Sequence, residues 1–505
     1  MLAAHASTFA IATLAAVVGV ACVSQLGDDG AAAGRAEQAA SNKINTLDFP
    51  NASGTLSSYS DNPKIMFKAN KIKDITFFTS YGTNGRACVH CHTPGDAWTV
   101  SAASVAYRFS HPLDTTNADC LIALAACPQA PAGSEGLDPI FRLVDGASSP
   151  LANVSTKEAR AAAYSMLLTK GLFRIGIGVP PAAEFTLVAV DDPYGYASAS
   201  ELSLFRRPLP TTNLRLSPTK KQTTATPTLT GVMWDGRETL PGHDIIFDLL
   251  DQANGATLGH AQATAGLTAA VRQSIVDFET GMHTAQSVDV AAGDLSSAGA
   301  GGGAEWLASN QPFYVGINDV LTGDAQTHAA FTPDVFTLYS AWAGGASPAR
   351  AQIARGQALF NRKPIAIKGV GGLNDALGVE TISGTCTTCH DSTNYGHHSV
   401  ALPIDIGLTD ASRRTADLPL YTLQNRTTGE QRQTTDPGRA LVTGKWKDIG
   451  KMKGPILRGL AGRAPYFHNG SAATLADAVN FYDARFAIGF TADEKADLVA
   501  FLKAL

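Results

Sequence analysis

Two short runs hold the side chains with the clearest chemistry in this chain of 505 residues. In each run two cysteines stand three positions apart and a histidine follows directly; the runs are Cys88-Val89-His90-Cys91-His92 and Cys386-Thr387-Thr388-Cys389-His390. Two thiols at this spacing can each form a thioether with one vinyl group of the same porphyrin, and the next imidazole can ligate its iron. A zinc site or a redox Cys-x-x-Cys pair would not require a histidine after both pairs. These pentads therefore predict two covalently bound haem c groups, with His92 and His390 as proximal ligands.

The N-terminal residues are typical of an export signal. Residues 9–20 are apolar and uncharged, and small residues follow up to Cys22. We therefore expect a signal peptide over residues 1–22 and a periplasmic or secreted protein. Cys22 is also a candidate lipid acceptor, although Gly19 stands where lipoprotein signals prefer a large aliphatic residue. Membrane attachment is expected only if Cys22 carries a lipid, because no other segment is long and apolar enough to span a bilayer.

Two further cysteines, Cys120 and Cys127, lie close together in a loop-like segment. Disulfides persist in the oxidising compartments to which exported proteins go. We therefore expect these two residues to form a local disulfide rather than two free thiols.

Composition limits the classes of partner. The formal net charge is -5, so the chain lacks the basic surface that nucleic-acid binding requires. Hydrophobic residues make up 45% of the chain, which is enough for packed cores, and the length suits two or three domains.

Helical patterns dominate the remaining sequence. Over residues 264–285, Leu267, Val271, Phe278 and Met282 recur at helical spacing and predict a core-facing helix. Capping signals predict three further helix starts, at Ser347-Pro348, at Thr474 with Asp477, and at Thr491 with Glu494. Strand-like alternation is scarce, so we expect a mainly α fold with two helical haem domains and long loops.

The expected domain limits follow from composition. We expect a flexible linker over residues 23–60, an N-terminal haem domain over 61–297, a Gly-rich linker or insertion over 298–345, and a C-terminal haem domain over 346–505.

Three sequence blocks, in a fixed order with the pentads, carry a family resemblance. They are Phe77-Phe78 through to His92, Met233-Trp234-Asp235-Gly236-Arg237-Glu238, and Pro455-Ile456-Leu457-Arg458-Gly459 with Ala464-Pro465-Tyr466-Phe467-His468-Asn469-Gly470 and Thr474-Leu475. With these blocks the chain resembles the bacterial di-haem cytochrome c peroxidase and MauG superfamily over most of residues 65–505, apart from insertions around 100–200 and 286–345. The resemblance implies two cytochrome c-like domains packed face to face, with Trp234 between the haems as an electron bridge. Taken alone, a tryptophan more often serves core packing.

The first haem site departs from the peroxidases of this family. Their N-terminal haem has a distal histidine, whereas the matching residues 206–213 contain none. The resemblance therefore implies an iron that is open on its distal side, as in the MauG branch. Gln252 matches the family's distal glutamine, but the distal glutamate has no clear counterpart. His260 stands in that neighbourhood and is the candidate for acid–base work, with an ordinary loop histidine as the alternative.

The second haem site also departs from the peroxidases. They place a methionine ligand where Tyr482 stands here, and the MauG branch has a tyrosine ligand there. A phenolate favours ferric iron, whereas a thioether favours ferrous iron. Met452 is the rival ligand, because no other methionine follows the second pentad. Its alternative role is packing.

The resemblance further implies a calcium ion near the interface of the two haem domains. The backbone carbonyls of Arg463 and Pro465 match two of its ligand positions, and Asn213 is the candidate side-chain ligand.

Three functions fit these features. The leading one is an exported di-haem peroxidase, which activates hydrogen peroxide at the N-terminal haem and relays electrons through the C-terminal haem. Its electron donor would be a small periplasmic cytochrome, a cupredoxin or a side chain of a protein substrate. The alternatives are a dioxygen-using enzyme similar to the rubber-cleaving members of the superfamily, and a non-catalytic di-haem electron carrier.

Overall fold

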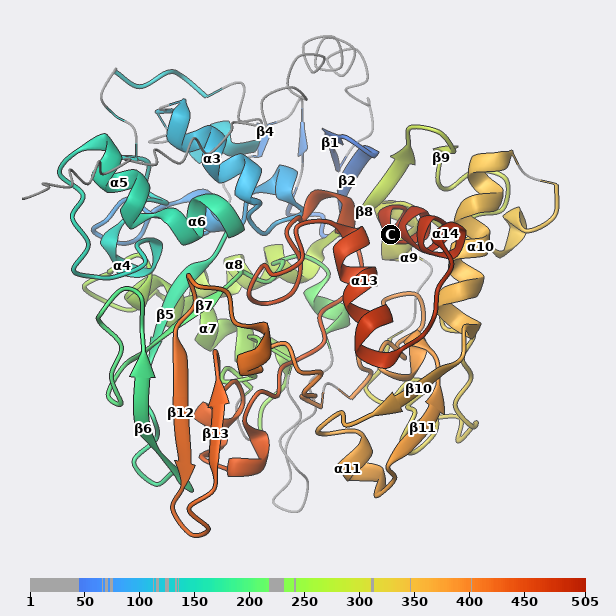
Figure 1. The fold of residues 1–505 in the computed structure, drawn as a ribbon. Coiled ribbons are helices and arrows are strands. Elements are labelled where there is room, and N and C mark those ends of the chain that lie inside the picture. Colours follow the sequence, from blue (N-terminus) through green and yellow to red (C-terminus); the bar gives the residue numbers. More distant parts are fainter. Residues whose placement is uncertain are drawn as a thin grey trace, which may run out of the picture. The chain divides into compact units, whose positions relative to one another are not determined.

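The protein is described here from a computed structural model. The structure describes residues 45–505 except 66, 69–70, 73–75, 112, 115–117, 123–126, 132–133, 135, 218–230, 240–241, 310–312, 346 and 401. The predicted signal peptide, Cys22 and the predicted linker up to residue 44 lie outside the described residues. The described residues belong to one compact unit, whose fold is shown in Figure 1.

A four-stranded antiparallel sheet opens the described chain. Its order is β1 (Thr46–Asn51), β2 (Gly54–Ser60), β8 (Met282–Asp289) and β9 (Gly293–Asp294). Leu47, Phe49 and Leu56 are buried, and the hydroxyl of Ser57 donates to Asp48 at 2.5 Å. Residues 46–60 are therefore not a flexible linker. The pattern was missed because β1 and β2 are short, and β2 takes its second partner, β8, from far along the chain.

The first core surrounds the first pentad. It contains residues of the antiparallel pair β1–β2, here called the hairpin, together with Phe77, Phe78 and Trp98. These pack against α2 (Cys88–Cys91), α7 (Ile245–Gly259) and α8 (Ala269–Gly281). The helix predicted over 264–285 is confirmed in its core contacts, since Leu267, Phe278 and Met282 are all buried in this cluster. Its bounds are shorter, because Thr268 caps α8 and Met282 begins β8.

The insertion around residues 100–200 adds short helices and strands. They are α3 (Ala102–Ser110), α4 (Leu143–Gly146), α5 (Lys157–Ala163), α6 (Ser165–Lys170), β5 (Phe173–Ile177), β6 (Phe185–Asp191) and, just after it, β7 (Leu202–Arg206). β6 pairs with β12 (Leu420–Asn425), which also pairs with β13 (Gln431–Thr434). Figure 1 shows β6, β12 and β13 side by side, so this sheet joins the insertion to the second half of the chain.

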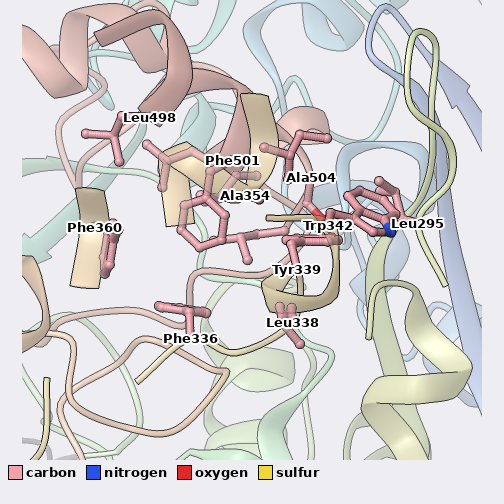
Figure 2. Packing of buried hydrophobic residues seen from close by; sticks show 14 of the residues in the cluster. Leu295, Phe336, Leu338, Tyr339, Trp342, Ala354, Phe360, Leu498, Phe501 and Ala504 are labelled. Atoms are coloured by element: carbon pink, nitrogen blue, oxygen red, sulfur yellow. Dashed lines mark hydrogen bonds between the residues drawn. The ribbon is translucent and has the colours of Figure 1, made fainter. Parts of the chain in front are cut away.

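A second core surrounds the second pentad. It contains α10 (Pro348–Arg362), α13 (Leu475–Phe486) and α14 (Ala492–Lys503). The predicted caps are confirmed: Ser347 caps α10, and capping boxes open α13 and α14. The expected linker 298–345 also packs here, as Figure 2 shows for Tyr339 and Trp342 beside Phe501 and Ala504. The Tyr339 hydroxyl donates to the carbonyl of Ala504 at 2.6 Å.

The other short elements complete the fold. They are β3 (Phe67–Lys68), β4 (Lys71–Ile72), α9 (Ala304–Ser309), β10 (Ile365–Lys368), α11 (Asn374–Leu377), β11 (Thr381–Gly384) and α12 (Ala440–Thr443). The described residues thus combine helices with five sheets, and the expectation of a mainly α fold is not confirmed. Within the described part of the chain, no helix has the length and apolar character needed to cross a membrane.

Candidate functional site

Each of two cavities is lined by one of the pentads. Cavity 1 is lined by Cys88, Cys91 and His92, and cavity 2 by Cys386, Cys389 and His390. None of these four cysteines is part of a disulfide. A pair of thiols and an imidazole that border the same cavity form the donor set that a c-type haem needs, so the residues present fit this group.

The two proximal histidines are held in the same way. Nδ1 of His92 lies 3.1 Å from the carbonyl oxygen of Trp98, and Nδ1 of His390 lies 2.5 Å from that of Gly396. In both cases the carbonyl belongs to the sixth residue after the histidine. A hydrogen bond from Nδ1–H to a carbonyl fixes the tautomer that leaves Nε2 free for a metal. Burial also lowers the pKa of His92 to about 4, which keeps its imidazole neutral and able to ligate iron.

A shared wall separates the two cavities. Both are lined by residues of the segments 207–210 and 453–455 and by Trp234 and Arg463. Trp234 is fixed on two sides: its indole N–H donates to the carbonyl of Arg207 at 2.7 Å, and its own carbonyl accepts from the Lys453 amide at 2.7 Å. The predicted bridge residue therefore borders both predicted haem sites.

Cavity 1 contains the polar groups that the sequence singled out. Gln252 and His260, in and directly after α7, both line it. Nδ1 of His260 lies 2.6 Å from Oδ2 of Asp145, which also pairs with Arg86 at 3.4 Å. Burial raises the pKa of Asp145, but the bond to His260 and the nearby guanidinium outweigh this and hold it below its usual value. Asp145 was missed because it lies 115 positions from His260 in the sequence.

Cavity 1 also contains a carboxyl group that was not predicted. Glu279, on α8, lines the cavity and is only 3% exposed. Burial raises its pKa to about 8, so the carboxyl is protonated at neutral pH. A signal existed in the sequence, since the acid stands beside Phe278 and near Ile275 and Val276, all of them buried on the same helix.

The wall of cavity 1 formed by residues 206–213 holds no imidazole. All eight residues line the cavity, and among them Pro208, Leu209 and Pro210 form an apolar stretch. This segment therefore offers no nitrogen ligand from the position of the family's distal histidine.

Cavity 2 is lined by both predicted alternatives for its second ligand. Tyr482, on α13, and Met452, which forms a β-bridge with Ile404, each border the cavity. Burial raises the pKa of Tyr482. His468 lines the same cavity, and its Nε2 is buried without a hydrogen-bond partner among the described residues. His468 belongs to the Pro-Tyr-Phe-His block of the family resemblance, but no role was predicted for it.

Known proteins resemble part of this chain. Cytochrome-c peroxidase IdrP1 of Pseudomonas sp. (strain SCT) is 31% identical over an alignment of 143 residues, which covers 24% of this chain and 36% of that protein. Cytochrome-c peroxidase IdrP1 of Denitromonas iodatirespirans is 32% identical over 143 residues, with the same shares of 24% and 36%. Cytochrome-c peroxidase IdrP2 of the same organism is 29% identical over an alignment of 141 residues, which covers 26% of this chain and 38% of that protein. Over this stretch the chain is similar to cytochrome-c peroxidases.

The matched region spans little more than a third of these peroxidases. No family model matches the chain. Among solved structures, a MauG-like protein associated with microbial copper homeostasis overlaps 61% of this chain and 77% of its own, at 16% identity and a TM-score of 0.28. Hydrazine synthase of Kuenenia stuttgartiensis overlaps 80% of this chain and 93% of its own, at 15% identity and a TM-score of 0.28. Overlaps at this TM-score support no conclusion about fold.

The calcium site implied by the peroxidase and MauG superfamily does not fit the residues present. The carbonyl oxygens of Arg463 and Pro465 both accept hydrogen bonds from Nη1 of Arg207. The carboxamide of Asn213 is held by the backbone of Thr284, donating to its carbonyl at 3.0 Å and accepting from its amide at 2.9 Å. Among the residues that the structure describes, no cluster of three or more His, Cys, Asp or Glu side chains could hold a metal ion.

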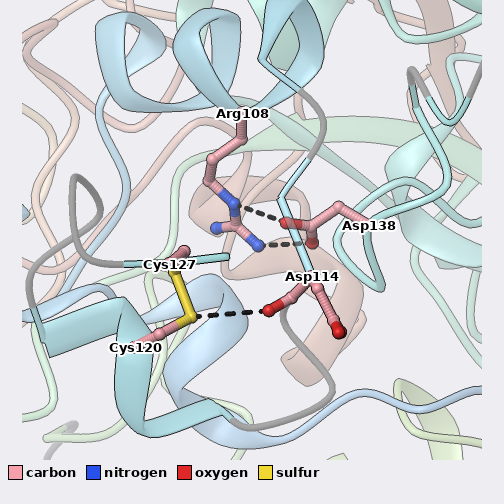
Figure 3. Close-up of a disulfide and its surroundings, with 5 residues drawn as sticks. All are labelled: Arg108, Asp114, Cys120, Cys127 and Asp138. Carbon is pink, nitrogen blue, oxygen red and sulfur yellow. Dashed lines mark hydrogen bonds and ion pairs between the residues drawn. A yellow bond between two sulfur atoms is a disulfide. The ribbon is translucent and has the colours of Figure 1, made fainter. Parts of the chain in front are cut away.

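A disulfide lies beside the first pentad. Cys120 and Cys127 are bridged, with Cα atoms 4.7 Å apart (Figure 3). Both belong to the cluster that contains Cys88. Figure 3 also shows the buried ion pair of Arg108 and Asp138; a third nitrogen of Arg108 donates to the carbonyl of His90 at 2.8 Å. Arg108 thereby ties Asp138 to the first pentad.

Proposed function

We propose that this chain is an exported di-haem c-type peroxidase, in which cavity 1 binds hydrogen peroxide and cavity 2 receives electrons from a donor. The observation that carries the proposal is the shared wall: Trp234 borders both cavities and is held by hydrogen bonds on either side. The relation to named cytochrome-c peroxidases supports the choice of oxidant. The apolar run at residues 9–20 and the Cys120–Cys127 disulfide support export.

The residues of cavity 1 suit proton transfer. When bound, haem c supplies a redox-active iron for cleavage of the peroxide O–O bond. The Asp145 carboxylate fixes Nδ1–H of His260, which leaves Nε2 to accept a proton from peroxide and return it to the departing oxygen. Gln252 offers an amide to orient the bound oxygen. Two electrons and two protons convert one peroxide into two waters.

The residues of the shared wall suit electron transfer between the cavities. Trp234 offers a conjugated ring at the boundary, and its ring centroid lies 6.1 Å from that of His468 in cavity 2. The donor would be a small cytochrome, a cupredoxin or a side chain of a protein substrate, since each delivers electrons one at a time.

The decisive experiment follows oxidation of a reduced small cytochrome or cupredoxin by peroxide. His260→Gln should lower kcat/KM for peroxide by about 100-fold or more, the usual contribution of a general acid–base group. Asp145→Asn should cause a smaller loss, because the imidazole stays but its orientation is less fixed. His243→Gln is the matched control; this residue stacks on Phe247 and does not line cavity 1. Wild-type protein that oxidises no donor with peroxide would overturn the proposal.

The two alternatives give different results in the same preparation. A dioxygen-using enzyme would turn over with an organic substrate in air and without peroxide. A carrier would show only low-spin iron in its oxidised spectrum. The imidazole-free segment 206–213 favours an enzyme with a high-spin fraction at the first haem.

A further inference from the structure

The side chain of Arg207 is an unusual buried cation. The residue is 6% exposed, and it lies in the wall shared by the two cavities. Its guanidinium donates to three backbone carbonyls, those of Val100, Arg463 and Pro465, and the Arg463 contact measures 2.6 Å. Its neighbour Arg206 is paired in the ordinary way, with the carboxylates of Asp235 and Asp436.

No carboxylate forms an ion pair with Arg207 among the described residues. The acid that acts on it electrostatically, Asp96, is itself buried and bonded to Ser104. Burial and the neighbouring Arg463 guanidinium lower the pKa of Arg207 to about 9, which still leaves it positively charged at neutral pH. A cation surrounded by carbonyl oxygens has the kind of environment that proteins otherwise give to a hard metal ion.

The backbone of Arg207 links the functional parts of the wall. Its carbonyl accepts the indole N–H of Trp234 at 2.7 Å, and its amide donates to the carbonyl of His468 at 2.7 Å. One residue therefore contacts the segment after the first pentad, the bridging tryptophan and the Pro-Tyr-Phe-His block of the second haem site.

We propose that the Arg207 guanidinium replaces a divalent cation between the two cavities, and that Arg207 is a positioning residue for Trp234 and the 463–468 segment. The carbonyls of Arg463 and Pro465, which would ligate a calcium ion, already accept hydrogen bonds from the positively charged guanidinium of Arg207. The junction then needs no metal to assemble. This follows from the contacts of Arg207 and does not depend on which oxidant the protein uses.

The first test uses the wild-type holoprotein. It should contain no stoichiometric calcium by elemental analysis. Its Tm and both haem spectra should be unchanged by excess EGTA or by millimolar calcium. Calcium present at one ion per chain, or a Tm that falls on chelation and recovers with calcium, would overturn the proposal. These readouts need no turnover, so failure of the peroxidase proposal would not be mistaken for failure of this one.

The second test uses variants of the holoprotein. Arg207→Gln should lower the Tm by about 5 °C or more, since three buried carbonyls lose a charged donor. It should also shift the spectrum or potential of the second haem, and Arg207→Lys should restore part of both signals. Arg355→Gln is the control, because this largely exposed residue pairs with Asp497 and lies in neither cavity wall. If Arg207→Gln matches the control in Tm and in haem signals, Arg207 positions nothing. If the variant does not fold, the wild-type calcium measurements still decide.

Discussion

The indole N–H of Trp234 donates to the carbonyl oxygen of Arg207 at 2.7 Å. This bond orients a ring that borders both cavities by tying it to a residue whose side chain is itself fixed by three carbonyls. The orientation of the proposed relay is thus set by the wall around it.

The variant Trp234→Phe should distinguish a role of Trp234 in electron transfer from a role in packing alone. The change removes the indole N–H and lowers the ease of ring oxidation but deletes no haem ligand, so both haem spectra should stay nearly unchanged. Donor oxidation should slow by about tenfold or more, as expected for the loss of an oriented group. Stopped-flow measurement of donor oxidation provides the readout. Trp446→Phe is the control, since Trp446 packs on Phe185 away from both cavities. Equal rates in the two variants would show that Trp234 only fills space.

The haem content should follow the pentads one by one. Wild-type protein should carry two haems that survive denaturation and acid–acetone extraction, since thioethers are covalent. Replacing Cys88 and Cys91 with alanine should remove one haem, and replacing Cys386 and Cys389 should remove the other. Intact mass and pyridine haemochrome spectra give the count. Extraction of haem from the wild type would contradict covalent attachment.

The second ligand in cavity 2 should be Tyr482. Its phenol lines the cavity from α13, where the surroundings are otherwise apolar. A buried phenol needs a polar partner, and ferric iron is a suitable one. Tyr482→Phe should turn the second haem high-spin, whereas Met452→Leu and His468→Gln should leave it low-spin. Absorption and electron paramagnetic resonance spectra of the oxidised proteins report this. A far-red sulfur-to-iron band that disappears in Met452→Leu would assign the iron to Met452 instead.

Glu279 should make stability depend on pH. Burial raises its pKa from 4.5 to about 8, so between these values the folded protein binds one more proton than the unfolded chain. Unfolding free energy should therefore fall as pH rises from about 4.5 to about 8. Glu279→Gln should flatten this part of the curve in urea unfolding of the holoprotein. Glu158→Gln, at an exposed position of α5, should keep the slope. A wild-type curve already flat across this range would show that Glu279 is ionised when folded.

The Cys120–Cys127 disulfide should be present in exported protein and contribute modestly to stability. Its closed loop is short, with a sequence separation of 7, so replacing both cysteines with alanine should cost about 2 kcal/mol of unfolding free energy. Mass spectrometry after alkylation without reduction should find neither thiol labelled. Labelling of both would show that the bridge does not form.

The sequence by itself determined what is encoded within a few residues. The pentads place thiols and imidazoles in one run, and the structure puts each run in the wall of one cavity. Helix starts at Ser347, Thr474 and Thr491 were predictable because a cap needs only a side chain and the next three amides. The position of Trp234 between two sites followed from a family block rather than from its own properties.

Tertiary structure alone decided the partners of the charged groups. Asp145 meets His260 across 115 positions, and Arg207 reaches the carbonyls of Arg463 and Pro465 across 256 and 258 positions. No local pattern marks such pairs, because the residues around an acid or an arginine in the sequence do not show whether its side chain faces water or a buried partner. β6 was missed for a related reason: its hydrogen bonds come from β12, a distant segment that only the folded chain brings alongside it. β2 likewise has β8 as a distant partner, in addition to its neighbour β1.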